Sequence, residues 1–176
     1  DFATVADVIA VLELRISLET EAAGLAAQRR SDQNLHAMQA ALQAVHDSIR
    51  DDSDAVPPDF QFHMEVARAT GNRHFADLMT YLGTMIIPRT RLNTARSAPE
   101  GRLPYLQRVN AEHETIYIAI RNRDAEAARA AMRTHLSNSR ERLRRGGAPD
   151  PAQRATQPLD GALLPASVDS QLYDDR

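Results

Sequence analysis

Apolar residues recur at helical spacing along most of the chain. The first stripe includes Val8, Leu12 and Ile16 and predicts a helix over roughly 7–29. Ser31 precedes the second stripe and suits the cap of its first turn. We find no alternation of apolar and polar residues long enough for a strand. The pattern predicts an all-α protein with helices over approximately 7–29, 31–50, 57–70, 72–95, 103–122 and 125–145.

Prolines and glycines mark several boundaries of these helices. Pro57 and Pro58 suit the first turn of the third helix, where a missing N–H costs nothing. Gly71 is placed to end that helix. Pro88 falls inside the fourth helix and is expected to kink or break it.

The last part of the chain differs in composition from the rest. Residues 146–176 hold five aspartates against two arginines and four of the nine prolines. Such a composition is typical of a disordered tail, although the apolar run at 159–164 could dock on the body or on a partner. We therefore expect two parts, an all-helical domain at 1–145 and an extended acidic C-terminal tail at 146–176.

The composition excludes several kinds of site and protein. Cysteine is absent, which excludes disulfides, thiolate zinc sites and cysteine catalysis. All 21 cationic side chains are arginine, which excludes lysine-based catalysis. A net charge of -3 argues against nonspecific electrostatic binding of nucleic acid by the whole surface. No apolar run spans a bilayer and no leader is seen, so we expect a cytoplasmic protein without a membrane partner.

Arginines gather at the end of the last predicted helix. Cations are favoured at a helix C-terminus, and we prefer this explanation to a nucleic-acid-binding patch. The four arginines are Arg140, Arg142, Arg144 and Arg145.

One acid and one histidine are placed so that both could bind the same cation. Asp59 and His63 are four residues apart, so they project from one helix face one turn apart. A carboxylate oxygen and an imidazole nitrogen in this arrangement can bind one cation. For the pair alone we favour the structural alternative, in which Asp59 is a first-turn acid and His63 a core histidine.

Two further histidines are expected to point inward. His113 shares its helix face with Ile116 and Ile120, and His135 shares its face with Met132. Buried imidazoles need partners, and three inward histidines on three helices could converge. One oxygen and three nitrogens suit Zn, Ni, Co, Fe or Mn, and they would leave octahedral positions for water or an oxyanion. From spacing alone, a metal site and separate core histidines both stay open.

The other three histidines carry no such signal. Each lies near a predicted helix surface or start, without a matching acid one turn away on an apolar face. We expect His36, His46 and His74 to be solvated.

Several short motifs follow one another in a specific order. Residues 13–19 read ELRISLE, residues 59–63 read DFQFH, and residues 69–72 read ATGN. Residues 112–120 begin with EHE, and residues 123–136 begin with RDAEAA and end with HL. The ordered set resembles the C-terminal ligand-sensing domain of FadR-type transcription regulators in the GntR family, and the resemblance covers about residues 7–142.

The resemblance implies a fold and a set of ligands. The fold would be an antiparallel bundle of six or seven helices, and we expect a homodimer. In many members an aspartate and three histidines bind a divalent metal, such as zinc or nickel. Their counterparts here are Asp59, His63, His113 and His135. A small organic acid, often a carboxylate, is the usual effector and would reach the open positions of the metal.

Two further residues are implied as effector contacts. Arg15 matches an arginine that can face the pocket in relatives, and it could clamp a carboxylate. Its alternative is an ordinary ion pair with Glu19 at spacing i, i+4. Asn72 could donate to the effector, although we favour its alternative role as a helix cap.

The family places a winged helix-turn-helix domain before this sensing domain, and the chain starts almost at the first bundle helix. The sequence is therefore expected to be a fragment or a stand-alone sensor. If it is a fragment, the whole protein would bind DNA only through the missing N-terminal domain. Effector binding would then favour one packing of the helices and change the spacing of the two DNA-binding domains in the dimer.

Three other functions are possible for these residues besides the sensor, and we expect no enzyme. A non-haem metalloenzyme could use the same residues, but such sites usually lie on strands, and Glu114 points away from the face of His113. A ferritin-like site needs Glu-x-x-His elements, which none of the six histidines provides. A plain helical dimerisation module with unliganded histidines is the third rival.

Overall fold

The computed structural model describes residues 5–90, 98 and 100–146, with the side chains of 85–90 left out. These residues form helices and contain no strand, which confirms the all-α prediction. None of the described helices has the length and apolar character needed to cross a bilayer. The elements are α1 (Val5–Arg29), α2 (Asp32–Arg50), α3 (Val56–Ala69), α4 (Arg73–Thr90), α5 (Arg102–Arg121) and α6 (Ala125–Gly146).

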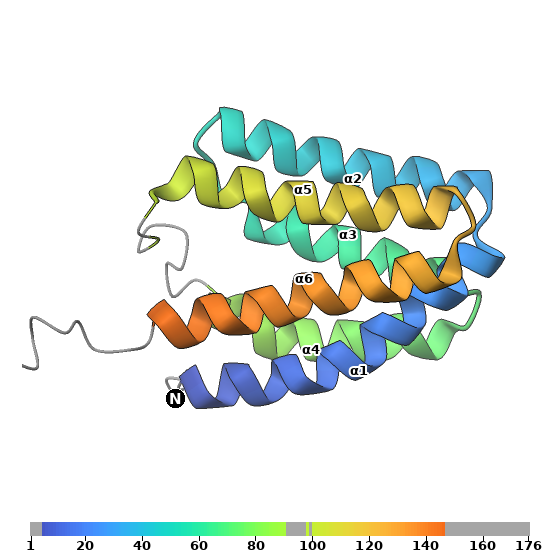
Figure 1. The fold of residues 1–176 in the computed structure, drawn as a ribbon, viewed down its shortest axis with the longest axis horizontal. Helices are drawn as coiled ribbons and strands as arrows, with labels where there is room; N and C mark the ends of the chain where they lie inside the picture. The colour runs from blue at the N-terminus through green and yellow to red at the C-terminus, as the bar shows by residue number, and fades with distance from the viewer. Residues whose placement is uncertain (1–4, 91–97, 99, 147–176) are drawn as a thin grey trace, which may run out of the picture.

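The helices lie along one common direction and alternate in sense, as an antiparallel bundle (Figure 1). Helix α6 packs against both α1 and α5, and α1 also contacts α3. Helix α2 packs on α3 and α5, whereas α4 lies at the edge against α3 and α1. The helices α1, α3, α5 and α6 therefore surround the middle of the bundle.

Local sequence signals set most helix ends. Ser31 and Asn34 form a reciprocal capping box: the Asn34 N–H donates to Ser31 Oγ at 3.1 Å, and the Ser31 N–H donates to Asn34 Oδ1 at 2.9 Å. Gly71 has a φ of 68°, which glycine adopts at little cost, and it follows α3 as predicted. Both caps agree with the expectations from the sequence.

Two predicted boundaries need comment. Helix α4 continues to Thr90, so Pro88 does not break it, and the alternative of a kink stays a prediction. The predicted extension over 91–95 lies outside the described residues. The tail from 147 onward, with its apolar run at 159–164, also lies outside them, and the division at 145/146 stays a prediction.

The core has a large apolar part and a smaller one. The large part joins α1, α2, α3, α5 and α6, and its alanines on α1 allow close packing of α6. At Gly24 the packing is so close that an added Cβ would lie 2.5 Å from Nε of Arg129. The smaller part joins α3 to α4 through Met64, Met79 and Leu82. Polar residues interrupt the apolar core where α1, α3, α5 and α6 meet.

Candidate metal centre

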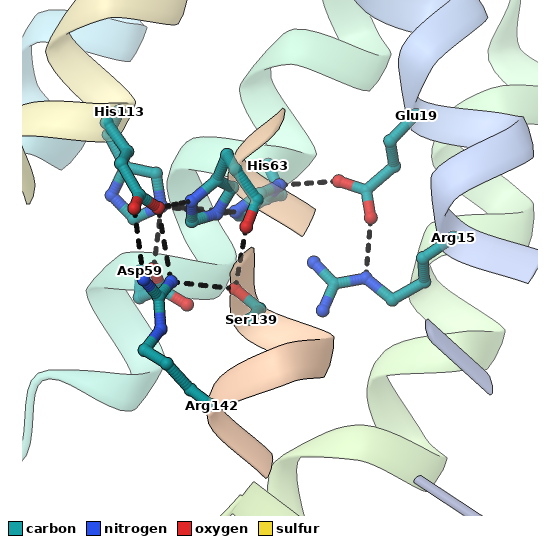
Figure 2. A network of polar contacts seen from close by, with 9 residues as sticks. Arg15, Glu19, Asp59, His63, His113, Ser139 and Arg142 are labelled. Atoms are coloured by element: carbon teal, nitrogen blue, oxygen red, sulfur yellow. Dashed lines mark hydrogen bonds and ion pairs between the residues drawn. The ribbon is translucent and has the colours of Figure 1, made fainter. Parts of the chain in front are cut away.

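Three histidines from three helices meet inside the bundle (Figure 2). The Nε2 atom of His63 lies 3.3 Å from that of His113 and 3.3 Å from that of His135. The Nε2 atoms of His113 and His135 are 3.1 Å apart. All three residues are at most 3% exposed. The structure therefore brings together the three histidines that were expected to point inward.

Asp59 joins this group through His113. Its Oδ1 atom lies 2.9 Å from His113 Nε2. The Asp59 side chain as a whole is 38% exposed, but its Oδ1 is buried and accepts no well-formed hydrogen bond from the described residues. The compact group consists of the three imidazoles, and Asp59 adds an anionic oxygen at one side of it.

The outer nitrogens of two imidazoles face carboxylates. His63 Nδ1 lies 2.5 Å from Glu19 Oε1, and His135 Nδ1 lies 2.7 Å from an oxygen of Glu112. An ionised carboxylate can only accept, so each of these Nδ1 atoms carries the proton. The Nε2 atoms of His63 and His135 therefore present lone pairs to the centre.

The centre consequently has more acceptors than donors. Two imidazole lone pairs and one Asp59 oxygen face a single nitrogen, His113 Nε2, that can donate one proton at most. Buried acceptors without donors are costly, and a cation would satisfy all of them. Two imidazoles on one zinc ion, each with a Zn–N bond of about 2.0–2.1 Å, would have nitrogens about 2.9–3.4 Å apart. The observed spacings of 3.1–3.3 Å fit this range.

The charge states at neutral pH suit a metal ion. Burial alone would raise the pKa of Glu19, but Arg15 and His63 outweigh burial and lower this pKa to about 2. The pKa of Asp59 is also held well below its usual range, despite burial, chiefly by His113. Burial, together with the charge of His113, lowers the pKa of His135 to about 3. Anionic carboxylates and neutral imidazoles are the forms that bind metals.

Arg15 shows the ion pair that was its alternative role. Its Nε donates to Glu19 Oε2 at 2.5 Å, and its side chain is 9% exposed. Its two terminal nitrogens form no hydrogen bond with the described residues, and in Figure 2 they point toward the side of the cluster where Ser139 lies. The ion pair and a contact to an effector are therefore compatible.

Asn72 forms no hydrogen bond with the cluster in the part of the chain that the structure describes. It is exposed in the turn between α3 and α4, where its Oδ1 accepts from the His74 backbone N–H at 3.1 Å. This is the geometry of the capping alternative. An effector contact by Asn72 stays a prediction.

No role at this site was expected for Glu112 or Arg142 from the sequence. Arg142 is one of the four arginines that we attribute to the preference of cations for a helix C-terminus, and the structure adds a specific partner for it. Its side chain is 16% exposed. The guanidinium binds both oxygens of Glu112, at 3.0 and 3.1 Å, and its Cζ lies 5.5 Å from the centroid of the Tyr105 ring. Glu112 directly precedes His113, but its partner His135 lies on the next helix, so no short spacing signals the contact.

The remaining histidines behave as predicted. His36, His46 and His74 are exposed. His46 has one ionic neighbour, with its Nε2 3.5 Å from Glu114 Oε1.

Comparison with known proteins finds relatives among bacterial transcription regulators. The FCD domain family matches residues 10–138. The HTH-type transcriptional regulator LutR of Bacillus subtilis is 33% identical over 132 residues, which cover 75% of this chain and 60% of LutR. The HTH-type transcriptional repressor NanR of Cronobacter sakazakii is 29% identical over 127 residues, which cover 72% of this chain and 47% of NanR. The chain thus spans about half to three fifths of these relatives.

A solved structure agrees on the fold. A GntR protein of Streptococcus agalactiae superposes with a TM-score of 0.61 and 22% identity, covering 76% of this chain and 58% of that one. The relatives named here are transcription regulators and not enzymes, so the metalloenzyme alternative gains no support. The chain belongs to the FCD domain family, the ligand-sensing C-terminal domain of GntR-family transcription regulators.

Proposed function

We propose that this domain binds a divalent metal ion through Asp59, His63, His113 and His135, and senses a small organic acid beside that ion. The observation that carries the proposal is the excess of buried acceptors: two imidazole lone pairs and one carboxylate oxygen share a single possible proton. Zinc, nickel or a similar borderline ion suits these donors. When bound, the ion supplies positive charge and open positions that a carboxylate can occupy.

Arg15 supports an acidic effector. The two terminal nitrogens of Arg15 form no hydrogen bond with the described residues, and such a guanidinium can bind a carboxylate with two parallel hydrogen bonds. Its Nε stays on Glu19, which fixes the direction of the guanidinium before the effector arrives. Pre-positioning of this kind lowers the entropic cost of binding.

The whole protein would be a DNA-binding regulator. The named relatives are described as HTH-type, and we infer that a helix-turn-helix domain outside this chain contacts the DNA. The working form would be a cytoplasmic homodimer, and no membrane partner is proposed. Effector binding shifts the packing of the bundle only to the extent that the effector binds one packing more tightly than the other.

Elemental analysis of the purified chain tests the metal site. We expect one divalent ion per chain in the wild type and strongly reduced occupancy in His113→Ala and Asp59→Ala. Full occupancy in both variants would reject the assigned ligands. A wild type that binds no ion would favour the plain dimerisation module.

Calorimetry on the metal-loaded chain tests the effector. We expect at least one compound from a panel of small mono- and dicarboxylates to bind, and Arg15→Ala to weaken it more than Arg15→Lys. Equal affinity in wild type and Arg15→Ala would remove Arg15 from the effector site. Steady turnover of any bound acid would favour the enzyme alternative.

A further inference from the structure

Two of the three central imidazoles are backed by a carboxylate that an arginine holds in turn. On one side the chain of contacts runs from Arg15 to Glu19 to His63. On the other side it runs from Arg142 to Glu112 to His135. Both series of contacts end at the same point in the bundle, although they start on different helices.

The series of contacts Arg15–Glu19–His63 is almost fully buried and links α1 to α3. Glu19 is 2% exposed and uses one oxygen for each neighbour: Oε2 accepts from Arg15 Nε at 2.5 Å, and Oε1 faces His63 Nδ1 at 2.5 Å. Because both oxygens are engaged, the carboxylate is held in one orientation. The orientation of the His63 ring is fixed with it.

The series of contacts Arg142–Glu112–His135 lies nearer the surface and links α5 to α6. The Glu112 side chain is 16% exposed. Oε2 faces His135 Nδ1 at 2.7 Å and also accepts from Arg142, while Oε1 accepts from Arg142 and from Asn138 at 3.0 Å. Two neighbouring side chains, Arg142 and Asn138, thus hold this carboxylate against His135.

His113 provides an internal contrast. Its Nδ1 is buried and has no hydrogen-bond partner among the described residues. Its orientation therefore depends on Asp59, which faces Nε2 at 2.9 Å, and on packing, including the tilted contact with the Phe62 ring at 5.0 Å between centroids. The carboxylate support at Nδ1 is specific to His63 and His135.

We propose that Glu19 and Glu112 are metal-positioning residues, which keep the proton of His63 and His135 on Nδ1 and aim each Nε2 lone pair at the ion. Arg15 and Arg142 hold these carboxylates in place. The inference rests on the proposed metal site. A carboxylate behind a ligand imidazole fixes its tautomer and increases its basicity, and loss of such a partner typically weakens metal binding about 10–100-fold.

Zinc titration of the metal-free chain against a chelating dye tests the proposal. We expect Glu19→Gln and Glu112→Gln each to weaken zinc binding by about 10–100-fold. The matched controls are Glu21→Gln on α1 and Glu114→Gln on α5, both at exposed positions, and they should bind as the wild type does. If buried Glu19→Gln fails to fold, the half-buried Glu112→Gln still decides the outcome.

Nitrogen NMR of the imidazoles gives a second readout that general destabilisation would not move. In the metal-free wild type, His63 and His135 should carry their proton on Nδ1, and each Gln variant should shift its own histidine toward a mixture of tautomers. Undiminished zinc affinity in both Gln variants, or a proton on Nε2 of both histidines in the wild type, would overturn the positioning role and leave the metal site standing. A wild type that binds no zinc would overturn the proposed function and this inference together.

Discussion

The bundle contains two buried regions that are completed in different ways. In the apolar region, residues such as Ala26, Met38 and Leu42 fill space with side chains that need nothing beyond close packing. In the polar centre, Asp59 and the three histidines place more acceptors than donors at one buried point. The apolar region is complete within the chain, whereas the polar centre would be completed by the proposed cation.

This difference separates two sources of stability. Packing stabilises the fold whether or not metal is present, because its main favourable term is the removal of apolar surface from water. An ion that binds only the folded state stabilises it by mass action, so its contribution depends on the free ion concentration. Substitutions in the two regions should therefore respond differently to added metal.

The largest expected effect is the response of the polar centre to zinc. At about 1,000 times the Kd, zinc should add about 4 kcal/mol to the free energy of unfolding, which raises Tm by about 10 °C in a chain of this size. His113→Leu should abolish this rise, because it removes one of the proposed ligands. It should also lower the metal-free Tm, because it removes the one nitrogen that can donate to Asp59 and to the neighbouring imidazole lone pairs. Thermal unfolding with and without zinc measures both values. An unchanged zinc response in His113→Leu would remove His113 from the site.

A cavity in the apolar region should lower the free energy of unfolding by the same amount with and without metal. Met38 is fully buried, and Met38→Ala should cost about 3 kcal/mol in the metal-free and the zinc-loaded chain alike. The volume-conserving Met38→Leu serves as the control and should cost less than about 1.5 kcal/mol. Urea unfolding gives these values. If Met38→Ala greatly reduced the zinc response, the two regions would not be independent.

Acid should destabilise the metal-free chain through the polar centre. The pKa of His135 is lowered from 6.5 to about 3 in the folded chain, so below about pH 6.5 the unfolded chain takes up the proton first. Stability should therefore fall with decreasing pH by up to roughly 1.4 kcal/mol per unit for this one group. Glu19 and Glu112, with pKa values lowered from 4.5 to about 2, add to the loss below about pH 4.5.

Urea unfolding of the metal-free chain between pH 7 and pH 4 measures this slope. Met38→Ala should lower the whole curve and leave its slope unchanged, because it lies in the apolar region. A stability that stays constant from pH 7 to pH 5 would contradict the burial of a neutral His135.

The smallest expected effect lies at a helix end outside both regions. Ser31→Ala removes the capping box of α2 and should cost about 1 kcal/mol. Ser31→Gly should recover most of this loss, because glycine is tolerated at the cap. Zinc affinity measured by dye competition should not change in either variant. A weaker zinc site in Ser31→Ala would mean that the polar centre depends on distant helix ends.

The sequence could predict most of the helices and the inward histidines. Helical periodicity, the cap at Ser31 and the turn at Gly71 are local signals, and they act over a few residues. The spacing of Asp59 and His63 is local as well. The set of four candidate ligands came from these signals together with the resemblance to a family.

The contacts between helices could not be predicted in the same way. Glu19 and His63 are 44 residues apart, and Glu112 and His135 are 23 apart, so no fixed spacing connects them. Arg142 looked like a terminal cation because its partner lies on another helix. Pro88 suggested a kink or a break, and α4 continues past it to Thr90, which excludes the break.

Anomalous scattering at the zinc edge, from crystals of the zinc-loaded chain, tests the central claim most directly. We predict one strong peak inside the bundle, about 2.0–2.2 Å from Nε2 of His63, His113 and His135 and from an oxygen of Asp59. A peak bound elsewhere, for example between His46 and Glu114 on the surface, with none between the three buried imidazoles, would contradict it.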